Sequence, residues 1–276
     1  MVNLKNKYRR HMQEKLDVIT NKLSNSRKSK KATHNTLGFN SFSIQPSKEN
    51  HAFFSVISHN IKNPFSTLLG FSDLLFEDFD ELDNEEKKFY LSEIKKSAKF
   101  TYQYIEKFFE WIYYKTGKIK LEFQSINVKE TVKTIIGNLE NQKNLKIPIS
   151  VQIDDAITVY ADPDSFEKII YNLIDNAIKF TTSNPKIVIS AREYDTKIQI
   201  SIQDNGIGIA PEDISKLFNI SIDPVTIGNS NNKGIGLGLI LTKELITLNK
   251  GIINVESSIE KGSIFSIILP VGKNKN

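Results

Sequence analysis

His59 is the side chain of this sequence that is best placed to act as a nucleophile. It lies in the segment FFSVISHNIKNP, residues 53–64, where apolar residues recur at alternating spacings of three and four. If Phe54 and Ile57 occupy the a and d positions of a heptad, His59 falls at position f, farthest from the apolar seam. A neutral imidazole has a lone pair on one ring nitrogen that can attack a phosphorus atom. A plain solvated histidine is the alternative that this segment alone leaves open.

Two asparagines and a proline follow His59 closely. An amide has no basic site near neutral pH, so Asn60 can orient the ring by accepting its N–H but cannot take its proton. Asn63 lies one turn after His59 on the same side of the predicted helix. Pro64 cannot donate a hydrogen bond to the carbonyl of Asn60, and its ring crowds that carbonyl. We therefore expect a kink beside the histidine.

Another helix, predicted over residues 164–180 later in the chain, places three polar side chains on one face. Asn172, Asn176 and Lys179 recur there at spacings of four and three. Amide carbonyl oxygens suit a hard cation such as Mg²⁺, and an ammonium group suits phosphate. Polar residues on the outer face of an amphipathic helix more often meet only solvent, which is the plain alternative. The buried face would consist of Phe166, Ile169, Ile170, Leu173 and Ala177.

Two glycine-containing segments could bring backbone close to a flat, charged ligand. In residues 204–209, DNGIGI, Asp204 ends an alternating strand and is followed by Gly206 and Gly208. A carboxylate there can accept a hydrogen bond from the amino group of a base, although an ordinary Asp-Asn-Gly turn has the same composition. In residues 233–239, KGIGLGL, three glycines precede a helix whose free N–H groups can bind phosphate. This segment lacks the patterns of a dinucleotide fingerprint and of a P-loop.

Two long helices, over residues 54–75 and 91–112, are expected to position His59. Each has an apolar seam with spacings of three and four, and the acidic segment DFDELDNEE connects them. An isolated antiparallel hairpin cannot bury both seams, so we expect two copies of the chain to form a dimeric four-helix bundle. The seams are Phe54, Ile57, Ile61, Pro64, Leu68, Phe71 and Leu75 on the first helix, and Leu91, Ile94, Ala98, Thr101, Ile105, Phe108 and Ile112 on the second.

The remainder of the chain alternates between short strands and helices. This pattern predicts an α+β fold, an α/β sandwich with helices on one face of a mostly antiparallel sheet. The chain would thus divide into a basic segment and linker (1–49), the helical hairpin (50–117) and the sandwich domain (118–276). The expected helices are 127–141, opened by an Asn cap, 164–180, opened by a capping box from Asp164 to Glu167, and 237–248; the expected strands are 121–123, 149–153, 186–193, 197–204, 252–257 and 263–269.

The composition excludes several kinds of site. Without cysteine there is no disulfide framework, thiolate metal site or cysteine nucleophile. No apolar run reaches the roughly 18 to 20 residues of a membrane-spanning helix, so we expect a cytoplasmic protein whose membrane contact, if any, would use its basic N-terminal segment. That segment, residues 1–31, holds ten Lys and Arg residues and accounts for the net charge of +5. The basic charge therefore does not predict a nucleic-acid partner.

The order of the motifs resembles that of one protein family. NLIDNAIKFT, DNGIGI, KLF and GIGLGL look like the nucleotide-binding boxes of the sensor histidine kinase ATPase domain, and GSIFSIILP is similar to its closing strand. FFSVISHNIKNPFSTLLGFSDLL resembles the phosphoacceptor helix of the same kinases. The ATP-binding fold is shared with chaperones, type II topoisomerases and mismatch-repair ATPases. A His-bearing hairpin ahead of this fold is not a feature of those other groups.

The resemblance implies ATP and Mg²⁺ as ligands, a homodimer, and a response regulator receiver domain as partner. His59 would take the γ-phosphoryl group and pass it to an aspartate of the receiver. Asn176 would be the Mg²⁺ ligand, Lys179 would meet phosphate, and Asp204 would meet the adenine amino group. The other nucleotide-binding residues implied are Asn172, Phe180, Gly206, Gly208, Phe218, Gly234, Gly236, Leu237 and Gly238.

Asn60 departs from the pattern of this family, in which the position after the phosphoacceptor is commonly an acidic residue regarded as the base. Because general-base help is worth about 10² to 10⁴ in rate, autophosphorylation would be slow or would pass the proton to water or phosphate. Asn63 matches the position thought to hold the hydrolytic water when the partner is dephosphorylated. The alternative function is therefore a degenerate kinase that acts as a response-regulator-binding phosphatase or scaffold.

Overall fold

The computed structural model describes residues 48–116, 120–143, 148–181, 184–219 and 236–272. The chain divides into two compact units, residues 1–101 and 102–276. The domain boundaries expected from the sequence stay a prediction. In the described part of the chain, no helix combines the length and the apolar character that crossing a membrane requires.

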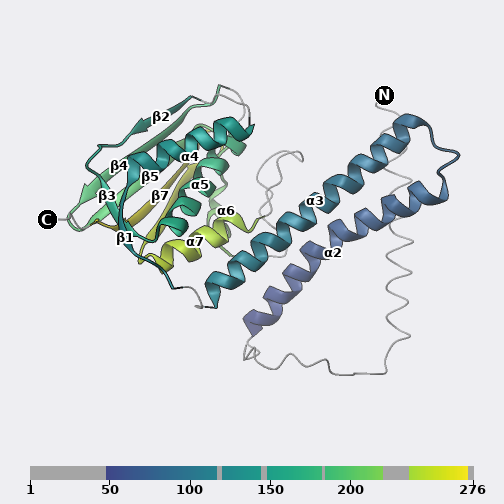
Figure 1. Cartoon of the computed structure of the whole chain (residues 1–276), viewed down its shortest axis with the longest axis horizontal. Helices are drawn as coiled ribbons and strands as arrows, with labels where there is room; N and C mark the ends of the chain where they lie inside the picture. The colour runs from purple at the N-terminus through teal and green to yellow at the C-terminus, as the bar shows by residue number, and fades with distance from the viewer. Residues whose placement is uncertain (1–47, 117–119, 144–147, 182–183, 220–235, 273–276) are drawn as a thin grey trace. The chain divides into compact units, whose positions relative to one another are not determined.

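A helical hairpin makes up the described part of the first unit, and its second helix continues into the second unit (Figure 1). Helix α2 spans Lys48–Glu77 and continues through Pro64, and α3 spans Asn84–Lys115. A reciprocal capping box starts α3: Asp83 Oδ1 accepts a hydrogen bond from Glu86 N at 2.8 Å, and Glu86 Oε2 accepts one from Asp83 N at 3.0 Å. The acidic connector thus ends in a fixed helix start that returns the chain along α2.

The hairpin buries an apolar cluster next to this connector. Phe71 of α2 and Tyr90 of α3 are buried with their ring centroids 5.5 Å apart, and Leu74 lies in the same cluster. Leu75, Leu82 and Ile94 pack against it while partly exposed. The predicted seam of α2 is confirmed at Ile57 and Phe71, which are both buried.

The predicted seam of α3 is confirmed only in part within a single hairpin. Thr101 is buried as expected, but Leu91 is 54% exposed and Ala98 is exposed too. Their chain neighbours Tyr90 and Ser97 take the buried positions instead. One hairpin therefore buries the neighbouring face of α3 and leaves an apolar face with Leu91 uncovered.

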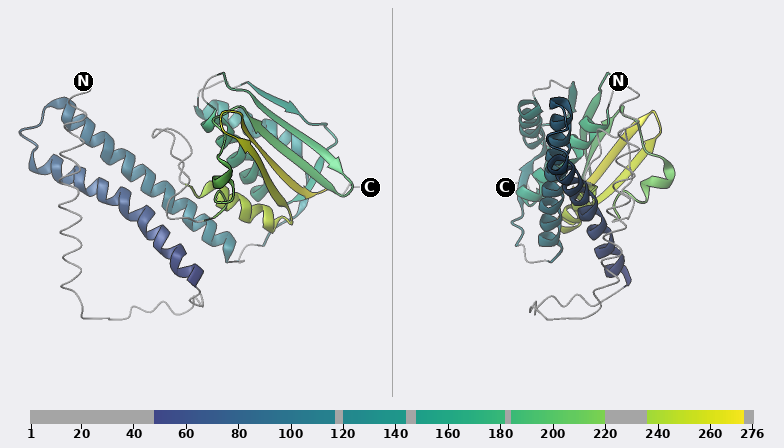
Figure 2. Two further views of the ribbon diagram at one scale, coloured as in Figure 1. Left: turned by 180° about the vertical axis from the view of Figure 1, so that it is seen from behind. Right: turned by 90° about the vertical axis from the view of Figure 1, so that its right-hand side faces the viewer.

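A five-stranded sheet, in the order β2-β4-β5-β7-β6, forms the centre of the second unit. Only β2 and β4 pair in parallel; the other neighbours in this sheet are antiparallel, and β1 and β3 form a separate antiparallel pair. Helices α4, α5 and α7 cover one face of the sheet, which confirms the predicted sandwich (Figures 1 and 2). The bounds are β1 Gln124–Asn127, α4 Val128–Lys143, β2 Ile149–Gln152, β3 Thr158–Ala161, α5 Pro163–Phe180, β4 Ile187–Tyr194, β5 Lys197–Asp204, α6 Pro211–Ile214, α7 Gly238–Leu248, β6 Ile252–Ser258 and β7 Gly262–Pro270.

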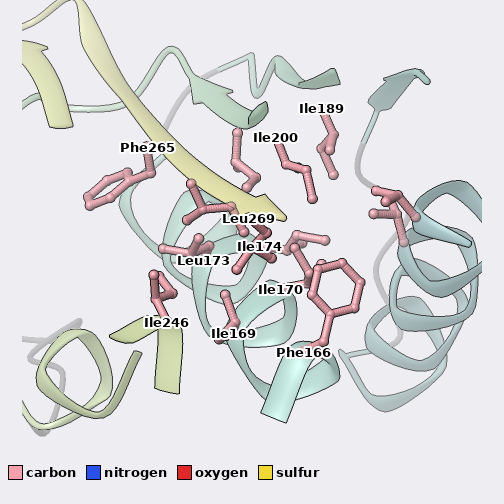
Figure 3. Packing of buried hydrophobic residues seen from close by; sticks show 14 of the residues in the cluster. Phe166, Ile169, Ile170, Leu173, Ile174, Ile189, Ile200, Ile246, Phe265 and Leu269 are labelled. Carbon is pink, nitrogen blue, oxygen red and sulfur yellow. The ribbon is translucent and has the colours of Figure 1, made fainter. Parts of the chain in front are cut away.

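The apolar face of α5 packs against this sheet (Figure 3). Each fully buried Ile, Leu or Phe side chain stabilises the fold by about 1.5 to 3 kcal/mol, so this stripe fixes the rotation of α5 about its axis. The buried face is the one predicted from the sequence, extended by Ile174. The residues of this face belong to one apolar cluster with Ile189 of β4, Ile200 of β5, and Phe265 and Leu269 of β7.

The helix starts show how local signals compete. Asn127 caps α4 as predicted, because its Oδ1 accepts a hydrogen bond from the backbone N–H three residues on at 2.9 Å. The predicted capping box of α5 is wrong: Asp162 is the N-cap, and its Oδ1 accepts a hydrogen bond from Ser165 N at 2.9 Å. Pro163 occupies the first turn, where its fixed φ and missing N–H favour an earlier helix start.

The short elements were the hardest to predict. The strand expected at 121–123 lies at β1, residues 124–127, and neither β3 nor α6 was expected. Each of β1 and β3 has four residues; they pair with each other, and Val159 of β3 also forms a single bridge with Val271. Their positions follow from this pairing, which local alternation does not reveal.

The last turns of α3 belong to the second unit. Tyr114 is buried in the same apolar cluster as α5. Lys168 of α5 donates a hydrogen bond to Tyr114 Oη at 3.0 Å and forms an ion pair with Glu110 at 2.8 Å. Lys115 also pairs with Glu244 of α7 at 3.0 Å. These polar contacts join the end of α3 to two helices of the sandwich.

The pKa values of this ion pair define its pH range. Burial lowers the pKa of Lys168, but its bonds with Glu110 and Tyr114 outweigh burial and raise the pKa from 10.5 to about 12. Burial raises the pKa of Glu110, but hydrogen bonds from Lys168 and Lys107 outweigh it and hold the pKa below its usual 4.5. The stability that Glu110 contributes is lost as pH falls through its lowered pKa, and that of Lys168 is lost as pH rises through about 12.

We expect Lys168→Met to lower the free energy of unfolding of the second unit by about 1 kcal/mol or less at neutral pH, since the pair is partly exposed. The exchange Glu110→Lys with Lys168→Glu should recover part of the loss. Urea unfolding at several pH values measures both, with the exposed Lys186→Met as a control. An equal loss in the control, or a loss that persists below the Glu110 pKa, would contradict the assigned role of the pair.

Candidate functional site

His59 lies on the exposed side of α2, as its predicted heptad position requires. The side-chain amide of Asn63 contacts its ring: Asn63 Nδ2 lies 3.1 Å from His59 Nε2 and 3.5 Å from Nδ1. The backbone carbonyl of Asn63 accepts a hydrogen bond from Thr67 Oγ1 at 3.1 Å. Asn60 is half-buried, and an effect of its amide on the ring stays a prediction. Contact with the imidazole is therefore established for Asn63.

The polar face of α5 carries the predicted phosphate and metal residues. Asn172, Asn176 and Lys179 are all half-buried. Asn172 Nδ2 donates a hydrogen bond to Thr242 Oγ1 of α7 at 3.3 Å, which ties the two helices together at this edge. Lys179 Nζ lies 3.7 Å from an oxygen of Asp175. The predicted residues thus share one edge of α5, and two of them have partners that the sequence did not suggest.

Asp204 is a buried carboxylate at the end of β5, only 5% exposed. Its Oδ1 accepts a hydrogen bond from the backbone N–H of Gly206 at 2.8 Å. Burial raises the pKa of Asp204, and backbone hydrogen bonds from Gly206 and Ser263 offset this only in part. A carboxylate held in place by backbone donors is a suitable acceptor for the amino group of a base.

Three glycines let backbone segments approach each other around Asp204. A Cβ atom on Gly206 would collide with the carbonyl oxygen of Phe180, and one on Gly208, at φ +70°, would collide with that of Ser258. Gly262, at φ +87°, starts β7, and a Cβ there would collide with the carbonyl of Asp204. Only Gly206 and Gly208 were predicted. Each of the three therefore has a packing requirement of its own.

Backbone hydrogen bonds fasten the segment after Asp204 to its surroundings. Ile207 N donates to the carbonyl oxygen of Phe180 at 3.2 Å, and Glu260 N donates to the carbonyl oxygen of Ile207 at 2.8 Å. Ile209 N donates to Ser257 Oγ at 2.8 Å. The predicted site residue Phe180 thus positions this segment through its main chain, from the last residue of α5.

The start of α7 carries the predicted phosphate-binding glycines. Gly236 has φ +76°, Leu237 is buried at the N-cap position, and Gly238 is the first residue of the helix. Among the described residues, no atom lies within 4 Å of a Cβ placed on Gly238, so their packing does not require glycine there. Gly234 lies outside the described residues.

Phe218 and α7 show a contact that sequence reasoning missed. Phe218 is half-buried against the apolar core, and Lys243 Nζ lies 5.7 Å from its ring centroid. Thr242 and Lys243 come four and five residues after Gly238, one turn into α7. That spacing from the last glycine is the one signal that could have identified them.

Two family models match the chain. The model of the His Kinase A (phospho-acceptor) domain matches residues 49–112, which include His59. The model of the histidine kinase-, DNA gyrase B- and HSP90-like ATPase matches residues 161–273, which include the site around Asp204. The chain belongs to the sensor histidine kinase family. The predicted fold, phosphoacceptor region and ATP-binding region are thereby confirmed as those of a histidine kinase.

Relatives of this histidine kinase core are longer proteins. Sensor histidine kinase GacS of Pseudomonas protegens is 30% identical over 84% of the chain and 26% of its own length. Signal transduction histidine-protein kinase BarA of Escherichia coli is 30% identical over 81% of the chain and 25% of its own length. The chain therefore spans about a quarter of each of these two relatives.

Solved structures of histidine kinases share this fold. The histidine kinase AdeS of Acinetobacter baumannii has a TM-score of 0.59 at 23% identity, covering 78% of this chain and 98% of its own. The histidine kinase ThkA in complex with the response regulator protein TrrA has a TM-score of 0.57 at 23% identity, covering 81% of this chain and 62% of its own. At this identity the likeness supports the arrangement of the elements.

The burial of Asp204 in this histidine kinase predicts opposite effects on stability and binding. Because folding raises its pKa, the stability linked to Asp204 is fully present below its unfolded pKa and is lost as pH rises through the folded value. Asp204→Asn keeps an acceptor for Gly206 N–H. We expect an equal or higher free energy of unfolding at neutral pH, together with about 10- to 100-fold weaker ATP binding, the range for a hydrogen bond to a charged group.

Urea unfolding and nucleotide titration calorimetry of Asp204→Asn measure these two effects. Glu256→Gln, an exposed carboxylate on β6, is the matched control and should change neither. A variant that is destabilised at neutral pH, or that binds ATP as the original chain does, would contradict the role assigned to Asp204.

Proposed function

We propose that this chain is the core of an ATP-dependent protein-histidine kinase. His59 receives the γ-phosphoryl group of ATP, and an aspartate of a response regulator then receives it from His59. The observation that carries the proposal is an exposed histidine in a region matched by the phospho-acceptor model, in the same chain as a matched ATPase domain. The proposal concerns the activity of this core, which corresponds to only part of the length of its longer relatives.

The residues of the second unit suit ATP and Mg²⁺. Asp204 provides a buried acceptor for the adenine amino group, and the backbone N–H of Gly206 holds that carboxylate in place. Lys179 provides positive charge for phosphate, and the open space at Gly238 lets phosphate reach the N-H groups at the start of α7. Asn176 offers an amide oxygen as metal ligand, and Mg²⁺ bound there would neutralise phosphate charge.

The chemistry at His59 follows from the exposure of its ring. One ring nitrogen forms a bond to the γ-phosphorus as the bond from phosphorus to ADP breaks, and ADP leaves with the electron pair. The phosphorylated imidazolium then releases the proton on its other ring nitrogen. Asn60 is an amide and cannot accept that proton, so water or phosphate takes it. Phosphoryl transfer depends mainly on positioning and charge neutralisation, so the reaction proceeds without a strong base, at a reduced rate.

A response regulator is the partner that completes the reaction. An aspartate oxygen attacks the phosphorus of phosphohistidine, the N–P bond breaks, and His59 returns to its original state. The solved complex of ThkA with TrrA is a precedent for such a partner, since a histidine kinase of the same fold is seen there with a response regulator protein. The exposed position of His59 leaves the ring accessible to a second protein.

A second copy of the chain is the partner expected for the hairpin. Phe76 of α2 is 87% exposed, and Phe65, Leu69 and Leu91 are each about half exposed. Large apolar side chains that remain on the surface of a hairpin mark an interaction face. Phe65, Leu69 and Phe76 are spaced by four and seven residues, so they lie on one side of α2. This apolar side supports the four-helix bundle as the dimer interface.

We expect incubation with γ-labelled ATP and Mg²⁺ to give acid-labile, alkali-stable label on the chain, and His59→Gln to abolish it. ATP binding by the variant should be unchanged, since His59 lies outside the matched ATPase domain. The stability of the label in acid and in alkali identifies phosphohistidine, and nucleotide titration measures ATP binding. Normal ATP binding without label in the original chain would reject the kinase and favour the phosphatase or scaffold.

We expect Asn60→Asp to raise the initial labelling rate by about 10²-fold or more, because a carboxylate can accept the ring proton. Asn60→Ser, which is also unable to act as a base near neutral pH, is the matched control. Single-turnover labelling at saturating ATP separates this effect from nucleotide binding. Equal rates for Asn60→Asp and the original chain would show that proton removal does not limit the reaction.

A further inference from the structure

Side-chain hydrogen bonds join α5 and α7 at two levels. Near the start of α5, Asn249 Oδ1 accepts a hydrogen bond from Asp162 N at 2.8 Å, and Asn249 Nδ2 donates one to Ser165 Oγ at 2.7 Å. Farther along α5 and earlier on α7, Asn172 Nδ2 donates a hydrogen bond to Thr242 Oγ1 at 3.3 Å. The two helices therefore run antiparallel, and these bonds fix their register.

This register leads from the second bond to the candidate metal and phosphate residues. One turn beyond Asn172 on α5 lies Asn176, the candidate metal ligand. One turn before Thr242 on α7 lies Gly238, where the helix and its N–H groups begin. The bond between Asn172 and Thr242 is thus one helical turn away from both.

The hydroxyl of Thr242 decides which end of the Asn172 carboxamide contacts it. Thr242 is fully buried, and its hydroxyl hydrogen is donated to the carbonyl oxygen of Gly238 at 2.8 Å. A hydroxyl has one hydrogen, so Thr242 Oγ1 can only accept from a further partner. That partner must be the NH₂ group of Asn172, and the carboxamide oxygen Oδ1 is therefore turned away from Thr242.

The orientation of this carboxamide matters for a cation. A carboxamide that turns by 180° exchanges its donor and acceptor ends, and only the oxygen end can bind Mg²⁺. The same end is needed for a water molecule held by Mg²⁺, because the oxygen of that water is on the metal and only its hydrogens are left to donate. With Nδ2 bonded to Thr242, Oδ1 is the end of Asn172 that is left to meet such a ligand.

We propose that Thr242 is a positioning residue for the binding of Mg²⁺-ATP. It holds the Asn172 carboxamide with the oxygen available to the metal or its water molecules, and it keeps α5 in register with the start of α7. Because Thr242 is fully buried, it acts through Asn172. This inference rests on the proposed function, since ATP and Mg²⁺ are the ligands proposed for this edge.

Thr242→Val tests the role, because valine has nearly the shape of threonine but no hydroxyl. The Asn172 carboxamide can then turn either way, and we expect Mg²⁺-ATP to bind about two- to tenfold more weakly, the range for one neutral hydrogen bond. ATP binding in excess EDTA should be unchanged, because the change concerns the metal. Thr242→Ser, which keeps the hydroxyl, should bind Mg²⁺-ATP as the original chain does. Titration calorimetry measures all three.

Thr247→Val is the matched control. Thr247 is exposed on the same helix, and its hydroxyl donates a hydrogen bond to the carbonyl oxygen of Lys243 at 2.9 Å, as that of Thr242 does to Gly238. This substitution removes the same kind of hydroxyl and should leave nucleotide binding unchanged.

A double-mutant cycle with Asn172→Ala shows whether Thr242 acts through Asn172. Thr242→Val should have no further effect on Mg²⁺-ATP binding once residue 172 is alanine. In the nucleotide-free protein, urea unfolding should show that the two substitutions affect stability less than additively. A role of Thr242 in packing alone would leave the effects additive and would not depend on Mg²⁺.

The outcomes separate this inference from the proposed function. If Thr242→Val binds Mg²⁺-ATP as the original chain does, or is weakened equally with and without Mg²⁺, the positioning role is overturned and the kinase proposal stands. Weaker Mg²⁺-ATP binding that serine restores, and that disappears in the Asn172→Ala background, supports the role even in a chain that takes no label on His59. An original chain that binds no Mg²⁺-ATP overturns both.

Discussion

The burial of one apolar stripe of α5 against the five-stranded sheet is the constraint on which the second unit depends. It fixes the rotation of the helix, and so it decides that Asn172, Asn176 and Lys179 share the edge next to α7. The same helix ends at Phe180, whose carbonyl holds the segment after Asp204. One hydrophobic contact surface therefore positions the candidate metal ligand, the candidate phosphate ligand and the candidate base acceptor together.

Much of this arrangement could be predicted from the sequence, because it depends on local periodicity. The period of α5 identified its buried face, the alternation of β5 located Asp204 at a strand end, and the heptad pattern placed His59 on the exposed side of α2. These signals lie within single elements, where spacing alone decides which side of the element a residue occupies.

The parts that were missed depend on contacts between elements far apart in the sequence. Gly262 needs its positive φ because the Asp204 carbonyl lies against it, and Thr242 meets Asn172 only after α7 has packed on α5. On α3, spacing identified an apolar surface but not which of its sides a single hairpin buries. Leu91 was therefore predicted to lie in the buried seam, whereas its neighbour Tyr90 is the residue that the hairpin buries. Long-range packing supplies this information, and periodicity does not contain it.

The attachment of the end of α3 to the sandwich affects how the chain can be divided. Tyr114 contributes to the core of the second unit, Trp111 packs against that core, and Glu110 is bonded to Lys168. A fragment that began after α3 would expose the apolar surface beneath Tyr114 and leave Lys168 without these two partners. The smallest ATP-binding fragment that retains its complete core thus begins within α3, before Glu110, and limited proteolysis that cuts this helix on its N-terminal side would release it intact.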